Sequence, residues 1–273
     1  MIPLINVTDR QALWQFWPDI SFGIIAVNYL ALKKRTKLYR AAIASGIKRA
    51  LNYDGICISV LVGDNWLLDN TPVSEYFEDV SRMRFDAGTT HDDYVYWKDP
   101  PEYRYHRIHK MLDRAYELVQ LKPDFDLIGI VKGASEAEIR LCIDRLRDMN
   151  IRLMAFPCSE LAFEERHQDI QEFLRYGRKL KLWRWLIGIG SPQLMWKFDA
   201  DCYSSPKWCY SAALGYEFSR LRVKHSEHYP HCNHRLCTSL AQSRSRRDVI
   251  RARHNMLSLV EIDKDLRSRE ETG

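Results

Sequence analysis

Short apolar runs alternate with longer amphipathic stretches along most of the chain. The apolar runs cover residues 22–30, 55–64, 83–88, 126–133, 151–157, 185–190 and 197–204. Between them, apolar positions recur at helical spacing, as in "RIHKMLDRAYELVQL" and "DIQEFLRYGRKL". Continuously apolar strands that are separated by helices of this length are typical of a parallel sheet.

Seven strand–helix units favour a barrel over an open doubly wound sheet. The eighth strand is expected at 216–223, "YEFSRLRV". The sequence "SEAE" at 135–138 has the Ser-x-x-Glu form of a capping box and predicts the start of a helix. We therefore predict an α/β fold, a (β/α)8 TIM-like barrel over residues 1–224.

Polar residues stand near the ends of the predicted strands, where a barrel of this kind places its functional site. They are Asn28, Asp64, Asp86, Asp92, Asp93, Lys132, Ser159, Asp201, Ser204 and Ser205. Carboxylates at strand ends also serve as N-caps of the following helices. The pattern leaves both roles open for each acid.

A cluster of cysteine and histidine follows the predicted barrel. Cys232, His234 and Cys237 form a Cys-x-His-x2-Cys pattern, and His254 could complete a set of four from a helical, basic segment. Thiolates and imidazoles in such a set suit a closed, structural zinc site. Other histidines of the same region are alternative ligands, and free thiols beside surface histidines are the alternative to a metal. We predict a C-terminal zinc-binding subdomain with a basic helix over 225–273, holding a structural Zn²⁺.

The distribution of charge and the number of cysteines indicate which kind of partner the protein binds and in which cellular compartment it is found. The net charge is only +5, but basic residues gather at 33–40, 175–185 and 243–253. Such runs are usually solvated helix faces, yet three of them favour a nucleic-acid partner. Seven irregularly spaced cysteines fit reduced thiols, and no signal peptide or membrane-spanning run is present. We expect a soluble, cytoplasmic protein without a membrane partner.

Several motifs resemble those of the tRNA-guanine transglycosylase superfamily. They are the cysteine–histidine cluster with "RHNML", the stretch "LIGIGSPQLMWKFDADCYSS", the strand "IGIVKG" at 128–133 and the stretch "RFDAGTTHDDYVYW" at 84–97. The segments "DADCYSSPKWCYSAALG" and "TTHDDYVYW" look nearest to the branch that exchanges guanine in DNA for a 7-deazaguanine base. The resemblance spans roughly residues 20 to 260.

The resemblance implies a reaction as well as a fold. In this family a carboxylate attacks the sugar carbon and displaces guanine, and the incoming base then attacks the covalent glycosyl-enzyme. The implied partners are DNA and a 7-deazaguanine base, with tRNA as the alternative substrate, and a homodimer is a habit of the family. The zinc cluster would stabilise the fold rather than take part in the reaction.

Four residues of this sequence match base-binding positions of the family. Asp92 stands where the family holds the donor edge of the purine, and Asp93 is its neighbour. Lys132 stands where the family has a glutamine. Trp208 matches the tryptophan that the DNA-modifying branch adds after the nucleophile, so the resemblance implies substrate contacts for all four.

The catalytic positions match less directly. Ser204 falls on the position of the family's nucleophilic aspartate, so that either Asp201 attacks in its place or the activity is altered or lost. Asp64 is the acid nearest to the family's proton donor and acceptor. These matches predict a DNA-modifying transglycosylase. The alternatives are a tRNA-modifying enzyme and a catalytically silent barrel that binds nucleic acid or a partner subunit.

Overall fold

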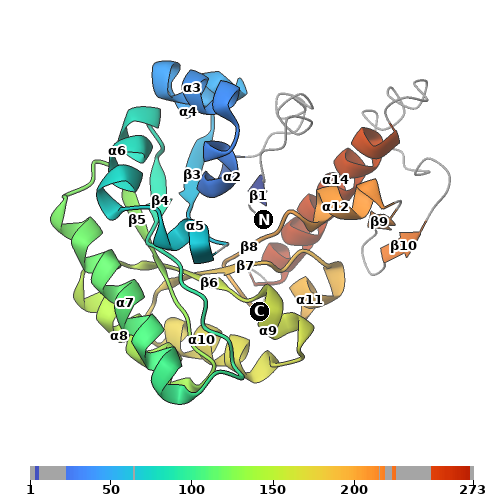
Figure 1. Cartoon of the computed structure of the whole chain (residues 1–273). Coiled ribbons are helices and arrows are strands. Elements are labelled where there is room, and N and C mark those ends of the chain that lie inside the picture. The colour runs from blue at the N-terminus through green and yellow to red at the C-terminus, as the bar shows by residue number, and fades with distance from the viewer. Residues whose placement is uncertain are drawn as a thin grey trace.

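Eight parallel strands form one curled sheet in which the spatial order follows the chain order. The computed structural model describes residues 4–5, 23–63, 65–214, 216–218, 223–225 and 247–270. The strands are β1 (Leu4–Ile5), β2 (Ile24–Asn28), β3 (Ile56–Val60), β4 (Ala87–Thr89), β5 (Asp126–Ile130), β6 (Leu153–Pro157), β7 (Trp183–Ile187) and β8 (Cys202–Ser204). The sheet has the form of a half-barrel, which is compatible with a TIM-like barrel (Figure 1). The predicted α/β class is confirmed.

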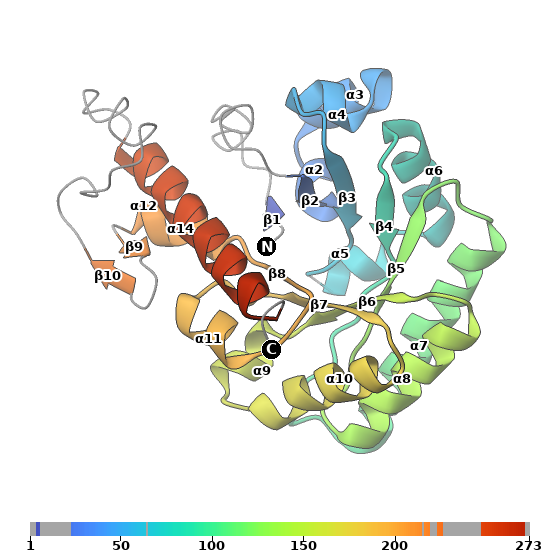
Figure 2. The same cartoon turned by 180° about the vertical axis from the view of Figure 1, so that it is seen from behind.

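Helices follow most of the strands along the chain. They are α2 (Tyr29–Lys33), α3 (Thr36–Ser45), α4 (Ile47–Leu51), α5 (Asn65–Asp69), α6 (Val73–Met83), α7 (Pro101–Gln120), α8 (Glu136–Asp148), α9 (Ser159–Phe163), α10 (His167–Lys179), α11 (Pro192–Lys197), α12 (Lys207–Ala213) and α14 (Arg247–Glu270). Figure 2 shows α6, α7, α8 and α10 along the outer face of the sheet. In the described part of the chain, no helix is long and apolar enough to cross a membrane.

The core explains why the apolar runs are continuous. Inner strand residues such as Ile58, Ile130 and Trp185 are buried, and so are residues on both faces of the same strands. Helix α7 buries one stripe of side chains at helical spacing, which includes Ile108, Met111, Leu112, Ala115 and Leu118. Strands with both faces covered contain few polar positions, so their hydrophobicity does not alternate.

The helix start predicted from the Ser-x-x-Glu sequence is confirmed at α8, although the Glu138 side chain binds the backbone N–H before Ser135 rather than that of Ser135. Ser135 Oγ accepts a hydrogen bond from the Glu138 backbone N–H at 3.3 Å, and Glu138 Oε2 accepts one from Ala134 N–H at 2.8 Å. The buried Glu138 carboxylate also pairs with Arg104 of α7, with Oε1 2.8 Å from Nη2. The capping residue therefore also joins α8 to α7.

The prediction of an eighth barrel strand at 216–223 is wrong. β9 (Tyr216–Phe218) pairs antiparallel with β10 (Val223–His225) in a separate two-stranded sheet, and β1 lies beside β2 as the eighth strand of the large sheet. The segment carries charged residues at Glu217, Arg220 and Arg222. Charged residues suit a segment with a solvated face and oppose a strand that is covered on both faces.

The C-terminal helix α14 packs on α12 and β9, as both views show (Figures 1 and 2). The buried Asn255 side chain accepts a hydrogen bond from Phe218 N–H at 2.7 Å and donates to the carbonyls of Trp208 at 3.1 Å and Tyr216 at 3.0 Å. One amide thus ties α14 to α12 and β9. The predicted boundary between residues 224 and 225 falls inside β10.

Candidate active site

The segment that follows β4 is fixed to its neighbours by two threonines. Thr89 Oγ1 accepts a hydrogen bond from Leu61 N–H at 2.9 Å, just after β3, and Thr90 Oγ1 accepts one from Ile130 N–H at 2.8 Å, at the end of β5. Both side chains are buried. The next residues, His91 to Tyr94, are therefore held at the carboxyl edge of the sheet, which is the edge that carries function in folds of this kind.

Asp92 and Lys132 form an ion pair at this edge, in which the Asp92 side chain is buried and the Lys132 side chain is 14% exposed. Lys132 follows β5 by two positions, and its Nζ lies 3.1 Å from Asp92 Oδ1. Burial raises the pKa of Asp92 above its usual value, and the Lys132 ammonium partly offsets this effect. A buried carboxylate with a raised pKa beside one specific charge partner is typical of a functional site. The structure thus brings together two residues that the sequence had assigned to the site.

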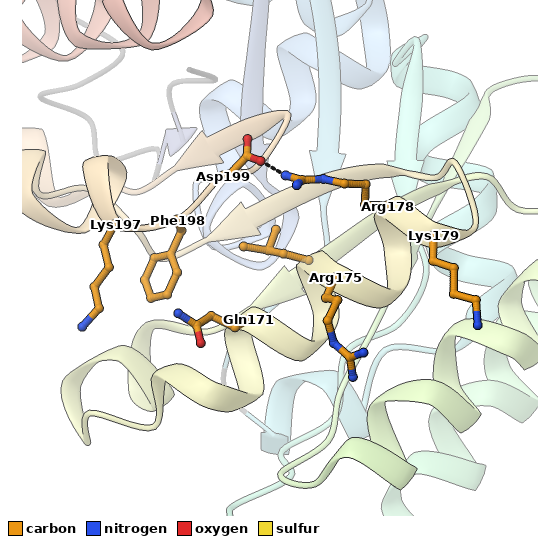
Figure 3. A pocket seen from close by; sticks show the side chains of 8 residues that line it. Gln171, Arg175, Arg178, Lys179, Lys197, Phe198 and Asp199 are labelled. Carbon is orange, nitrogen blue, oxygen red and sulfur yellow. Dashed lines mark ion pairs between the residues drawn. The ribbon is translucent and has the colours of Figure 1, made fainter. Parts of the chain in front are cut away.

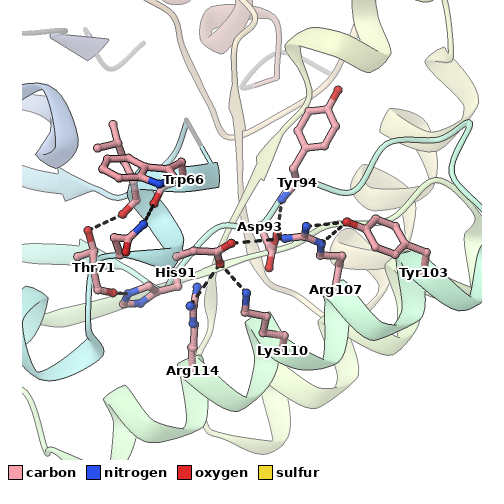
Figure 4. A network of polar contacts seen from close by, with 12 residues as sticks. Trp66, Thr71, His91, Asp93, Tyr94, Tyr103, Arg107, Lys110 and Arg114 are labelled. Atoms are coloured by element: carbon pink, nitrogen blue, oxygen red, sulfur yellow. Dashed lines mark hydrogen bonds and ion pairs between the residues drawn. The ribbon is translucent and has the colours of Figure 1, made fainter.

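Asp93 lies beside this pair and is also buried. Its Oδ1 accepts hydrogen bonds from the backbone N–H of Tyr94 at 2.7 Å and from Arg107 Nη1 at 2.8 Å, and Arg107 Nη2 donates to the Tyr103 hydroxyl (Figure 4). Asp93 Oδ2 has no hydrogen-bond partner among the described residues. A buried carboxylate oxygen in this state can accept a hydrogen bond from a ligand.

Helix α7 provides the cations that support the acidic edge. Arg107 Nη1 lies 3.9 Å from Asp69 of α5, Lys110 Nζ lies 2.5 Å from the same carboxylate and Arg114 Nη2 lies 3.4 Å from it (Figure 4). The hydrogen bond from Lys110 contributes most to lowering the pKa of Asp69. The network joins α5, which follows β3, to the segment that follows β4.

His91 belongs to the same segment, although none of the sequence motifs assigned a role to it. Its ring is fully buried, its Nε2 lies 3.1 Å from the Thr71 carbonyl, and it packs edge-on against Tyr76 at 5.6 Å. Burial lowers the pKa of His91 to about 4, so that the imidazole is neutral at pH 7 and Nε2–H donates to the carbonyl. Its position directly before Asp92 and Asp93 is the one sequence signal that points to it.

Asp201 lies at the opposite edge of the sheet, which corrects its assignment as the nucleophile. It precedes β8, and its carboxylate binds Arg184 of β7 through the backbone N–H at 2.7 Å, Nε at 2.8 Å and Nη2 at 2.9 Å. Asp86, which precedes β4, binds in the same way to the backbone N–H of Cys57 at 2.7 Å. Both acids are held at the amino edge of the sheet by these contacts. Because Asp92 lies at the carboxyl edge, they cannot reach a substrate that is bound there.

Ser204 and Trp208 are both buried and already have structural contacts. Ser204 is the last residue of β8, at the carboxyl edge, and its Oγ accepts a hydrogen bond from the indole Nε1–H of Trp185 at 2.9 Å. Trp208 lies in α12 beneath α14, and its carbonyl accepts a hydrogen bond from Asn255. The expectation that Trp208 contacts a substrate is corrected, because its ring belongs to the core.

Most of the predicted zinc ligands lie outside the described residues. These are Cys232, His234 and Cys237, and the predicted catalytic Asp64 lies outside them as well. His254 lies on α14, with Nε2 3.0 Å from the carbonyl oxygen of Phe218. Within the ranges that the structure describes, no group of three or more His, Cys, Asp or Glu side chains is placed to hold a metal ion.

A cavity of about 480 Å³ lies at the amino edge, beside the end of α10 and the segment before β8 (Figure 3). It is lined by Gln171, Leu174, Arg175, Arg178, Lys179, Lys197, Phe198 and Asp199. Arg178 pairs with Asp199, and Lys197 Nζ lies 2.6 Å from His167 Nδ1. Because the cavity faces the other edge of the sheet, it is separate from the site around Asp92.

No family model matches the chain, and no curated protein matches it significantly. The fold and the site define an α/β half-barrel protein with a buried carboxylate that pairs with a lysine at the carboxyl edge of its sheet. The chemistry of that pair is the basis on which a function is inferred.

Proposed function

We propose that this protein is a base-exchanging transglycosylase that replaces guanine in DNA with a 7-deazaguanine derivative. The observation that supports the proposal best is the ion pair of the buried Asp92 with Lys132. Guanine carries the acceptor O6 beside donor N–H groups on N1 and N2. An ammonium can donate to O6 while the adjacent carboxylate accepts from N1–H and N2–H. A 7-deazaguanine has the same edge, so one site can hold the leaving base and the incoming base in turn.

Burial makes this recognition selective. Asp93 Oδ2 adds a second buried acceptor next to Asp92. A base without the donor groups of guanine leaves these carboxylate oxygens unsatisfied, and sites that are built on hydrogen bonds reject such analogues strongly. We therefore expect adenine to bind far more weakly than a 7-deazaguanine.

The proposed exchange needs a carboxylate that attacks the sugar carbon. Asp201 lies at the other edge of the sheet, and the Ser204 hydroxyl is buried against Trp185. Of the sequence-predicted catalytic residues Asp64 is left, and the proposal moves it from the role of proton donor and acceptor to that of the attacking carboxylate; it follows the last residue of β3 by four positions in the chain. Its amide variant should therefore lose base exchange and keep base binding.

The decisive experiment compares base binding and base exchange in the same protein. Binding of a free 7-deazaguanine base is measured by calorimetry, and incorporation is measured by nucleoside mass spectrometry after incubation with DNA or tRNA. Asp92→Asn should weaken binding by about tenfold or more, because it removes a charged acceptor. Asp148→Asn, at an exposed position of α8, is the matched control and should bind normally. Equal affinity of Asp92→Asn and the natural protein would refute the assignment of the base site.

We also propose that the fold is completed as a (β/α)8 barrel with a C-terminal structural zinc subdomain. Cys232, His234, Cys237 and His254 would hold the ion, and zinc would supply only cross-linking of the chain. In the tautomer in which His254 Nε2–H donates to the Phe218 carbonyl, Nδ1 carries the lone pair that would bind the ion. Zinc-bound histidines commonly donate their other N–H to a backbone carbonyl in this way.

Removing one zinc ligand tests the subdomain. Cys237→Ser should reduce zinc content and melting temperature together, because binding of a structural zinc contributes directly to folding. His228→Gln, a change of a neighbouring histidine outside the proposed set, should retain one zinc per chain. Zinc content is measured by mass spectrometry, and the melting temperature is measured by thermal unfolding. Stoichiometric zinc in Cys237→Ser would exclude Cys237 as a ligand.

A second candidate function is a catalytically silent barrel that binds nucleic acid. It is favoured by the burial of Ser204 at the family's nucleophile position and by the structural ion pair of Asp201. Under this reading, 7-deazaguanine binding and nucleic-acid binding persist, but neither DNA nor tRNA gains the modified base. The mass-spectrometric assay therefore separates the two functions.

A further inference from the structure

Large aromatic side chains are exposed on segments that leave the carboxyl edge of the sheet. Trp66 of α5 is 70% exposed, Tyr94 after β4 is 42% exposed, and Phe163 of α9 is 85% exposed. These segments follow β3, β4 and β6 respectively. Large aromatic rings that are exposed to water on segments at one edge of a sheet are typical of an interaction surface.

Two of the rings on the segment after β4 form a stack that ends in a cation. The Tyr94 and Tyr96 rings are stacked, with centroids 6.0 Å apart and planes 20° apart. Lys98 Nζ lies 5.7 Å from the Tyr96 centroid and 4.9 Å from the Trp97 centroid. The two tyrosine rings and the Lys98 ammonium therefore follow one another in the order in which they occur in the chain after Asp92.

The stack is held in place from both sides. The Tyr94 hydroxyl donates a hydrogen bond to Glu160 of α9 at 2.7 Å, and this bond raises the pKa of Tyr94 to about 12, so the hydroxyl stays protonated at neutral pH. The guanidinium of Arg166 lies 4.9 Å from the Trp97 ring centroid. Since the rings are already ordered, a ligand that stacks on them loses little additional conformational entropy.

We infer that Tyr94, Tyr96 and Lys98 form a stacking platform for an unpaired nucleic-acid strand. Every nucleobase has a flat π-face that can stack on tyrosine, and the neighbouring phosphates attract the ammonium. A base within a duplex has both faces covered, so the platform binds a strand that is open around the target base. The inference deepens the proposed function, on which it rests for the identity of the strand as the substrate.

Binding of labelled oligonucleotides tests the platform. Fluorescence anisotropy compares a DNA strand of about 12 nucleotides, the RNA strand of the same sequence and the DNA duplex. The double variant Y94A/Y96A should bind either single strand about tenfold more weakly or worse, since stacking on one ring contributes on that scale. Y94F/Y96F keeps the rings and should bind normally, and Y116A, at an exposed tyrosine near the far end of α7, is the control for surface tyrosines in general.

The outcomes separate the platform from the proposed function. Ring-dependent binding of DNA or RNA supports the platform, and preference between them identifies the strand, even if the protein exchanges no base. Normal strand binding by folded Y94A/Y96A, or duplex bound as tightly as single strand, overturns the platform even if base exchange occurs. Calorimetry with a free 7-deazaguanine base should give the same affinity for Y94A/Y96A as for the natural protein, because its contacts are with Asp92 and Lys132.

Discussion

Replacing Asp201 with asparagine should lower the free energy of unfolding by about 3 kcal/mol. Both carboxylate oxygens of Asp201 bind the buried Arg184, and one of them also accepts the Arg184 backbone N–H. The variant leaves a buried guanidinium without its counterion, which is far more costly than the loss of a surface ion pair. Because the Asp201 side chain is 34% exposed, the expected loss lies at the low end of the range for buried pairs.

Denaturant unfolding measures this loss, and calorimetry with a 7-deazaguanine base shows whether binding survives it. Asp199→Asn is the matched control, since Asp199 lies two residues away in an exposed ion pair with Arg178 and should cost less than about 1 kcal/mol. We expect Asp201→Asn to retain base binding and any base exchange while folded. A variant with normal stability and no base exchange would instead establish Asp201 as catalytic.

The continuous apolar runs predicted most of the sheet. The runs at 22–30, 55–64, 126–133 and 151–157 contain β2, β3, β5 and β6, because strands covered on both faces leave no room for polar positions. The same reason explains why the prediction of a barrel strand at 216–223 was wrong, because this stretch contains charged residues. That segment forms a separate antiparallel pair.

The acids before short strands could not be placed from the sequence. Asp86 precedes β4 and Asp201 precedes β8, and each of these strands has three residues. The apolar runs around them are longer than the strands, so an acid at the amino end and one at the carboxyl end look alike in the pattern. In the structure both acids accept a backbone N–H from the second residue of the preceding strand, Cys57 and Arg184 respectively.

The candidate site was predicted in part. The motifs pointed to Asp92 and Lys132, and the parallel sheet brings these residues to the same edge although they are 40 positions apart in the chain. The ion pairs that α7 makes with the site were not predicted, because the positions of Arg107 and Lys110 in the sequence are typical of an ordinary solvated helix face. Their partners Asp69 and Asp93 lie on other segments, and only the tertiary fold reveals them.

Acid should destabilise this protein through His91, with an effect of about 3 kcal/mol between pH 7 and pH 4. The pKa of His91 falls from an ordinary value of 6.5 to about 4 in the folded protein, chiefly because of burial. Between these values the unfolded chain binds a proton at this ring and the folded chain does not. The contribution is therefore fully present above about pH 6.5 and is lost progressively as the pH falls toward 4.

The comparison with His91→Gln isolates this contribution from the carboxylates that titrate in the same range. Glutamine can still donate to the Thr71 carbonyl but takes up no proton, so its unfolding free energy should fall less steeply with acid. The difference in stability between the natural protein and His91→Gln should decrease by about 3 kcal/mol from pH 7 to pH 4. His109→Gln, at an exposed position of α7, should leave the pH profile unchanged. Parallel stability profiles for the natural protein and His91→Gln would show that the ring accepts its proton as readily in the folded state as in the unfolded chain.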